Sequence, residues 1–146
     1  MKKLKLIFGV IIVALLGFMI SIPIVNDNTA NRTAKSVKEI ELPNDTEYIE
    51  SFSKAGKLVG NGNGMQYLGG ILIKSNLSLE ELQAHYSKYA KSEWEYIVEK
   101  QSDKEVRVVE HGSVLLKSDI NDDNYYIVYS WGDEYSIYSQ LDLRGH

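Results

Sequence analysis

The sequence predicts an α+β fold: an N-terminal transmembrane helix, then an antiparallel sheet of about 5–7 strands packed by one amphipathic helix. Three observations lead to this prediction. Residues 6–25 form an apolar segment that contains no charged residue. Residues 79–91 are a later stretch in which apolar side chains recur at helical spacing. Much of the remaining chain alternates apolar and polar residues between short turns, which is typical of antiparallel strands.

The apolar segment at residues 6–25 is long enough to cross a membrane as a helix. A segment of this length rises about 1.5 Å per residue and spans about 30 Å, the thickness of the bilayer hydrocarbon. Three lysines lie within residues 1–5, and the next basic residue is Arg32. Because basic residues favour the cytoplasmic side, we expect a cytoplasmic tail at residues 1–5, a single-pass anchor in the cell membrane, and the C-terminal domain outside.

A cleaved signal peptide is the alternative interpretation of the same segment, because both begin with basic residues and continue with an apolar core. A signal peptide would end at a cleavage site made of small residues, whereas this apolar run continues through Pro23, Ile24 and Val25. An uncleaved signal anchor is therefore favoured, with cleavage as the second interpretation.

Residues 26–44 are polar and contain few large apolar side chains, which predicts a tether between the anchor and a folded domain at residues 45–146. Three of the sixteen basic residues precede the anchor. The chain beyond it therefore carries thirteen basic against twenty acidic residues, a net charge of −7. This charge argues against nucleic-acid binding and predicts that the domain stands away from an anionic bilayer.

Two strands are expected at the start of the domain, at residues 46–55 and 65–74, separated by a glycine-rich turn. Gly69 and Gly70 interrupt the second of these strands. Glycines inside a strand indicate either a β-bulge or the close approach of another backbone.

The helix expected at residues 79–91 has a clear start signal. Ser78 stands at the N-cap position and Glu81 three residues later, which is the pattern of a capping box. A single apolar stripe predicts that the helix lies on one face of the sheet. The stripe consists of Leu79, Leu82, Tyr86 and Tyr89.

After the helix the apolar residues change to a period of two, which predicts further strands. These strands are expected at residues 94–98, 106–108 and 114–117, followed by a C-terminal hairpin of residues 125–131 and 135–143.

The turn Gly60-Asn61-Gly62-Asn63-Gly64 is the first candidate for function. Glycine-rich loops can present backbone N–H groups to an anion, so Asn61 and Asn63 are candidate partner-binding residues. A loop with purely structural glycines is the alternative. The segment is not a P-loop, since no Lys-Ser or Lys-Thr pair follows it.

No residue pattern identifies a catalytic, cofactor-binding or metal site, so we expect no cofactor and predict no enzymatic activity. Asp119, Asn121 and Asp123 begin like a calcium loop, but Asn124 and Ser130 stand where glycine and glutamate are required. The three histidines are not at metal-ligand spacing. The absence of cysteine excludes disulfides and a thiol nucleophile.

The ten tyrosines and two tryptophans all lie outside the apolar segment, and such side chains suit half-exposed faces and binding surfaces. The strand at residues 125–131 is apolar on both faces. A central strand covered on both sides explains this pattern, and an aromatic platform for a glycan or peptide is the functional alternative. The face with Trp131 is expected against the helix, and Tyr126 is expected to point outward near Tyr138. Both tyrosines are therefore candidate partner-binding residues.

Four segments carry a resemblance to known proteins, namely residues 56–67, 77–82, 125–132 and 143–146. With them the chain resembles a group of small membrane-anchored extracytoplasmic proteins of low-GC Gram-positive bacteria, for which no activity is known. The resemblance covers most of residues 45–146. It implies a membrane anchor and a bacterial exterior, and it supplies no catalytic residue.

These patterns favour a membrane-anchored extracytoplasmic domain that acts in binding or assembly at the cell envelope. The expected partners are the membrane, through residues 6–25, and an envelope protein or wall glycan. The alternative is a small envelope hydrolase or a wall-glycan-binding module. An enzyme would need a polar cleft with a group of shifted pKa, and a binding module would show an exposed patch of Tyr and Trp.

Overall fold

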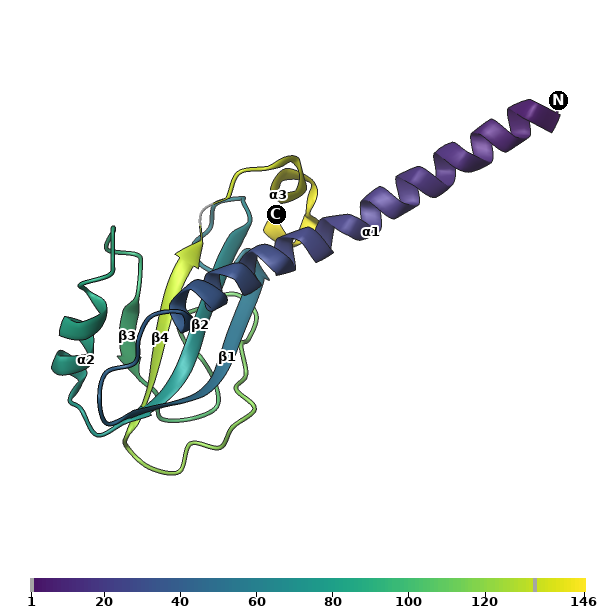
Figure 1. Cartoon of the computed structure of the whole chain (residues 1–146). Helices are drawn as coiled ribbons and strands as arrows, with labels where there is room; N and C mark the ends of the chain where they lie inside the picture. Colours follow the sequence, from purple (N-terminus) through teal and green to yellow (C-terminus); the bar gives the residue numbers. More distant parts are fainter. Residues whose placement is uncertain (1, 133) are drawn as a thin grey trace.

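The computed structural model describes residues 2–132 and 134–146, so Met1 of the expected tail and Asp133 lie outside the described residues. The α+β class is confirmed: a sheet is covered by helices on one face, and the long first helix projects from it as a rod (Figure 1). The elements in chain order are α1 Lys2–Lys38, β1 Thr46–Gly56, β2 Gln66–Ser75, α2 Leu79–Tyr86, β3 Ile97–Lys100, β4 Tyr125–Gly132, α3 Ile137–Leu141 and the short 3₁₀ helix η1 Leu143–Gly145.

The sheet contains four antiparallel strands within the described residues, in the order β1-β2-β4-β3, so the expected number of 5–7 strands is too high. The strands expected at residues 106–108 and 114–117 belong to a long loop between β3 and β4. In this loop Glu105 and Leu115 form an isolated bridge. A few apolar residues at alternating positions cover one face of the sheet here without forming a ladder. The buried ones are Val106, Val114 and Leu116.

The prediction of a strand at residues 135–143 is also wrong, because this segment forms α3 and η1. Ser136 begins α3: its hydroxyl accepts a hydrogen bond from the N–H of Ser139, and its own N–H donates to the Ser139 hydroxyl. Asp142 caps η1 by accepting from the N–H of Arg144. Such local bonds satisfy backbone donors that a strand could satisfy only with a neighbouring strand.

Helix α2 begins as predicted. The Ser78 hydroxyl accepts from the N–H of Glu81 at 3.2 Å, and the N–H of Ser78 donates to the Glu81 carboxylate at 2.8 Å. The helix ends at Tyr86, earlier than the predicted end at residue 91. Its apolar stripe ends there too, because Leu82 and Tyr86 are buried whereas Tyr89 is exposed.

The tether expected at residues 26–44 is replaced by helix over most of its length. Helix α1 continues without a break to Lys38, and its second half lies on the sheet (Figure 1). Ala30, Ala34 and Val37 recur at helical spacing and are buried against the strands. Alanines add little to an apolar pattern, so the buried face of this half was hidden among polar residues.

Helix α1 lies directly on two glycines of the sheet, with its backbone against Gly69 and the Thr33 side chain against Gly132. A Cβ atom on Gly69 would lie 2.2 Å from the backbone nitrogen of Ala34, and one on Gly132 would lie 2.4 Å from Oγ1 of Thr33. Neither position has room for a side chain. The close-approach interpretation of the interrupted strand is therefore correct at Gly69.

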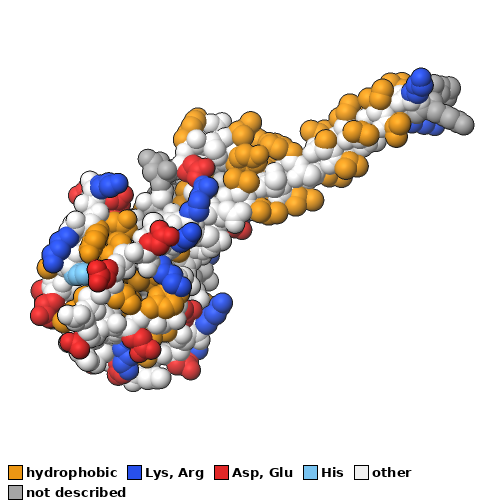
Figure 2. Space-filling view, in the orientation of Figure 1, with side chains coloured by type: hydrophobic (Ala, Val, Ile, Leu, Met, Phe, Trp, Pro, Cys, Tyr) orange, Lys and Arg blue, Asp and Glu red, His pale blue; other side chains and the backbone are white. Residues whose placement is uncertain are grey.

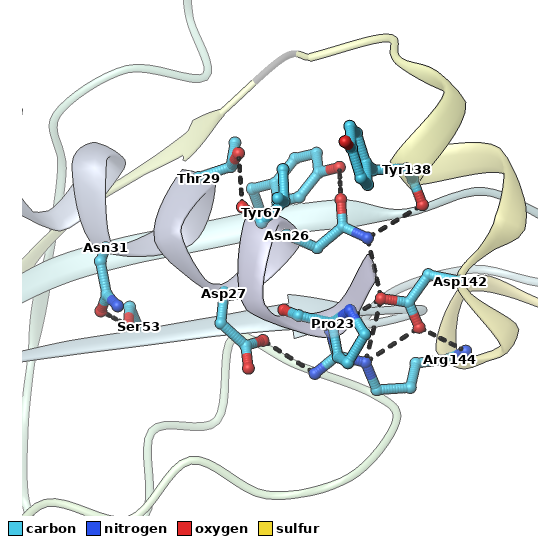
Figure 3. A network of polar contacts seen from close by, with 11 residues as sticks. Pro23, Asn26, Asp27, Thr29, Asn31, Ser53, Tyr67, Tyr138, Asp142 and Arg144 are labelled. Atoms are coloured by element: carbon cyan, nitrogen blue, oxygen red, sulfur yellow. Dashed lines mark hydrogen bonds and ion pairs between the residues drawn. The ribbon is translucent and has the colours of Figure 1, made fainter. Parts of the chain in front are cut away.

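Where α1 leaves the domain, a polar network joins it to the sheet and to the C-terminal segment (Figure 3). Buried Asn26 is its centre. The side-chain oxygen of Asn26 accepts from the Tyr67 hydroxyl at 2.7 Å. Its amide nitrogen donates to the Asp142 carboxylate at 2.8 Å and to the Tyr138 carbonyl at 3.0 Å. A buried asparagine is thereby satisfied on both its oxygen and its nitrogen.

Arg144 supplies the charged part of this network. Its guanidinium donates to Asp142 at 2.7 Å, to Asp27 at 2.8 Å and to the carbonyl of Pro23 at 3.2 Å. The Arg144 guanidinium, with a smaller contribution from the Asn26 amide, holds the pKa of Asp142 at about 2 although burial acts in the opposite direction. The carboxylate form of Asp142 is therefore the one that stabilises the joint between α1 and the C-terminal segment.

The two faces of β4 pack against different layers. Tyr126 and Val128 face α1 and α2, whereas Tyr129 and the half-buried Trp131 face the side covered by the loop before β4. The prediction that the Trp131 face packs against the helix is therefore wrong. Tyr126 does not point outward, since it is buried and its hydroxyl donates to the carbonyl of Leu77 at 3.2 Å. The interpretation of residues 125–131 as a central strand covered on both faces is confirmed for β4.

Replacing Gly69 by alanine tests the close packing of α1 on the sheet. Gly69→Ala should lower the free energy of unfolding by about 1–3 kcal/mol, because the added methyl group forces the helix backbone away. Urea unfolding of the full chain in detergent micelles, followed by tryptophan fluorescence, measures this change. Gly62→Ala is the matched control, since its added Cβ meets nothing within 4 Å. Equal effects of the two substitutions would contradict the packing.

The depressed pKa of Asp142 predicts a pH dependence of stability. Its contribution is fully present above the ordinary aspartate pKa of about 4 and is lost as the pH falls toward about 2. Asp142→Asn should lower the unfolding free energy by about 1–3 kcal/mol at neutral pH, because Arg144 loses its charged partner. The difference between the two proteins should shrink between pH 4 and pH 2 in urea titrations. A constant difference over that range would count against this role.

Candidate functional site

An open pocket of about 1130 Å³ lies at the β3 edge of the sheet. Typical small-molecule pockets occupy about 300–1,000 Å³, so this one has room for an extended ligand. Its walls come from α1, the loop between β1 and β2 with the start of β2, the segment before β3 with β3 itself, the loop after β3, and the end of β4. The lining residues that matter most for its chemistry are Thr33, Trp94, Tyr96, Tyr129 and Trp131.

The pocket exists because β3 is shorter than β4. Strand β3 begins at Ile97, opposite Tyr129, whereas β4 continues for three further residues to Gly132. Before Ile97 the chain leaves the ladder and touches β4 again where the N–H of Trp131 donates to the carbonyl of Trp94 at 3.2 Å. The segment between α2 and β3 therefore stands beside the free end of β4 and forms one wall (Figure 1).

Tyr96 turns the chain from this wall into β3. Its backbone has a φ of 55°, the left-handed conformation that favours glycine. Holding a tyrosine in this conformation costs about 1–3 kcal/mol, and such strained residues are concentrated at binding and catalytic sites. The turn at Tyr96 thus sets the shape of the pocket at the expense of backbone stability.

Both tryptophans of the chain line the pocket. The indole of Trp131 is half-buried and packs edge-to-face on Tyr129, with ring centroids 6.5 Å apart and an angle of 88° between the planes. Trp94 is 60% exposed. An exposed indole beside a fixed aromatic pair offers a partner an apolar ring with one hydrogen-bond donor.

Several polar side chains of the pocket are already paired with groups of the same chain. The Tyr129 hydroxyl donates to Oε1 of Glu99 at 2.6 Å. Burial, helped by the Glu99 carboxylate, raises the pKa of Tyr129, so the phenol stays protonated at neutral pH. At the rim, Arg107 forms ion pairs with Asp103 at 2.6 Å and Glu105 at 3.5 Å. The chemistry that the pocket offers a partner is therefore mainly that of its aromatic rings.

The four candidate residues from the sequence lie elsewhere. Asn61 and Asn63 are exposed in the loop between β1 and β2. The N–H of Gly60 in this loop already donates to the Glu110 carboxylate at 2.7 Å. Tyr126 is buried, and Tyr138 packs its ring on Phe18 with 5.7 Å between centroids. The structure does not bring the four together, and none is among the residues that line the pocket.

Acidic and histidine side chains outside the pocket form ion pairs or contact backbone carbonyls of the same chain. Among the described residues, no group of three or more His, Asp or Glu side chains is placed to hold a metal ion. The two carboxylates of the sequence that resembles a calcium loop lie beside lysines: Asp119 pairs with Lys104 and Asp123 with Lys100. Each histidine ring contacts a backbone carbonyl: His85 that of Glu41, His111 that of Gly60 and His146 that of Gln140.

The sequence did not reveal Trp94 as a site residue. Its alternation with Glu93 and Glu95 suggested a half-buried strand, but the strand begins only at Ile97. The left-handed turn at Tyr96 could not be predicted from the sequence, because residues in this conformation are ordinarily glycine or asparagine and tyrosine gives no sign of it.

Comparison of the chain with known proteins found no matching family model, no similar curated protein and no similar solved structure.

The positions of the two tryptophans predict a difference in solvent access. A Trp131→Phe protein, which keeps only Trp94, should emit at longer wavelength and be quenched more strongly by acrylamide. A Trp94→Phe protein, which keeps only the half-buried Trp131, should emit at shorter wavelength and resist quenching. Steady-state fluorescence of both proteins in detergent measures this. Similar quenching constants would show that the pocket wall at Trp94 is not arranged as described.

Proposed function

We propose that the protein is a single-pass membrane-anchored module that binds a partner at the outer face of the cell membrane, in recognition or assembly of the envelope. The observation that carries this proposal is the pocket of about 1130 Å³ with both tryptophans in its walls. Exposed aromatic side chains around a concave surface are typical of binding sites.

Helix α1 supports the anchoring part of the proposal. It is the one helix among the described residues that is long and apolar enough to cross a membrane. Its first half projects from the domain with hydrophobic side chains exposed along the rod (Figure 2). Water-soluble proteins rarely expose so large an apolar surface. The lysines at its start favour a cytoplasmic N-terminus and an extracytoplasmic domain.

The distance between the pocket and the membrane surface limits which partners can reach the pocket. Thr33 in the pocket wall lies eight residues beyond Val25, the end of the apolar segment. Along the helix axis this is about 12 Å. The partner is therefore one that presents an extended segment close to the membrane surface, and an envelope protein or a wall glycan meets this requirement.

Wall-glycan binding is the second candidate, and the exposed ring of Trp94 favours it. A flat apolar face with a polar N–H edge complements a sugar ring, which has apolar C–H faces and hydroxyls at its edge. Hydrolysis is less well supported. The raised pKa of Tyr129 keeps its hydroxyl protonated, so this residue is a poor general base at neutral pH.

The tryptophans allow a direct test, because ligand in the pocket must alter their emission. The full chain in detergent is titrated with soluble peptidoglycan fragments and, separately, with detergent-solubilised envelope proteins labelled for anisotropy. A saturable change in tryptophan emission or anisotropy is expected with one of the two. Trp94→Ala should weaken that binding at least tenfold, which corresponds to about 1.4 kcal/mol.

Tyr89→Ala is the control variant, since Tyr89 is an exposed aromatic residue outside the pocket lining and its loss should leave the affinity unchanged. Binding that is unaffected by Trp94→Ala would move the site away from the pocket. No saturable binding of either fraction would refute the proposed function.

A further inference from the structure

The C-terminal segment carries a group of exposed apolar side chains next to α1. We call them the C-terminal patch, which consists of Tyr135, Ile137, Leu141 and Leu143, exposed by 87%, 59%, 47% and 86%. Ile137 and Leu141 lie one turn apart and so share a face of α3. Hydrophobic side chains gather on the domain beside the base of the rod, next to the apolar surface of α1 (Figure 2).

Three contacts place this segment along α1. The ring of Tyr138 packs on the ring of Phe18, with 5.7 Å between their centroids. The Tyr138 carbonyl accepts from the amide of Asn26 at 3.0 Å, and Arg144 donates to the carbonyl of Pro23 at 3.2 Å. The C-terminal segment therefore lies beside residues 18–26 of the helix (Figure 3).

Most of this part of α1 belongs to the apolar segment that crosses the membrane. If the C-terminal segment stayed clear of the bilayer, only residues 6–17 would remain to span it. These residues extend about 18 Å, well short of the hydrocarbon thickness of about 30 Å. Including residues 1–5 would draw the three lysines of the tail into the hydrocarbon, where ammonium groups are strongly disfavoured.

We propose that the C-terminal patch inserts into the interfacial region of the leaflet from which α1 emerges, so that the domain binds the lipid surface at a second point. The inference deepens the proposed function and rests on its membrane anchor. Tyrosines are favoured at the level of the headgroups, which suits Tyr135 and Tyr138. Aliphatic side chains on one face of an interfacial helix enter the boundary of the acyl chains, which suits the remaining patch residues.

The charge of the domain does not oppose this contact. The net charge of −7 predicts that the domain as a whole stands away from an anionic bilayer, but the contact is apolar and local. Among the described residues, charged groups beside the C-terminal segment form ion pairs: Arg144 with Asp27 at 2.8 Å and Arg32 with Glu134 at 2.6 Å. Repulsion between the remaining acidic residues and lipid headgroups falls off within a Debye length of about 8–10 Å.

The experiment uses single cysteines, because the chain has no native cysteine. Leu143→Cys, labelled with the polarity-sensitive fluorophore NBD, reports on the patch. Asp123→Cys, in the exposed loop before β4, is the water-exposed control, and Val13→Cys is the control inside the apolar segment. The full-length proteins are reconstituted into vesicles of phosphatidylcholine and phosphatidylglycerol, with doxyl groups at shallow or deep positions of the lipid chains.

A blue shift of the Leu143 probe with quenching by the shallow doxyl group is expected, together with deep quenching at Val13 and neither effect at Asp123. A Leu143 probe that behaves like the Asp123 probe overturns the inference while Val13 quenching leaves the anchor intact. A Leu143 probe that is blue-shifted but not quenched by lipid also overturns it, because protein then covers the patch. Loss of quenching at Val13, with no flotation on vesicles, would refute the anchor itself.

Tyr135→Cys repeats the measurement at a second position, which is as exposed as Leu143 and contributes little to packing. The two positions should give the same result. The NBD emission and its quenching by doxyl lipids do not depend on a ligand in the tryptophan pocket. The experiment therefore distinguishes a failure of lipid contact from a failure of pocket binding.

Discussion

The contact of α1 with Gly69 and Gly132 is the interaction on which the other features of this protein depend. Because these positions have no Cβ atom, the backbone of α1 packs closely on Gly69 and the Thr33 side chain packs closely on Gly132. That approach places Thr33 in the wall of the tryptophan pocket and brings Asn26 within hydrogen-bond distance of Tyr67. A larger residue at position 69 or 132 would push α1 away from the sheet. This movement would widen the pocket at Thr33 and increase the distance between Asn26 and Tyr67.

The polar network joins α1 to the sheet and to the C-terminal segment. Asn26 is buried, so its hydrogen bonds to Tyr67 and Asp142 are strengthened by the low local dielectric, and losing one would leave a costly unsatisfied group. Asp142 in turn is held ionised by Arg144, which also reaches back to α1. Because α1 is continuous through this joint, no tether separates its apolar first half from the half that packs on the sheet.

Features set by neighbouring residues could be predicted from the sequence, and features set by distant ones could not. The cap at Ser78 and the strands β1, β2 and β4 depend on local patterns, and the structure contains them. The buried half of α1 was missed because Ala30 and Ala34 are small and gain their importance only from the facing glycines. The pocket was missed because its tryptophans come from segments that meet only through the unequal lengths of β3 and β4.

The same helix sets the position of the pocket and of the C-terminal patch relative to the bilayer. The pocket wall includes residues 33 and 36 of α1, and the patch lies beside residues 18–26, so the two are separated by roughly 10–25 Å along the axis. With α1 as the membrane anchor and the C-terminal patch as the second lipid contact, both as proposed above, the domain cannot rotate freely about its anchor. Its pocket then keeps one orientation above the membrane, which lowers the entropy lost on binding a partner that is itself fixed near the same surface. Such an arrangement favours ligands of the envelope over freely diffusing ones, because only a ligand confined to this layer benefits from a pocket confined to it.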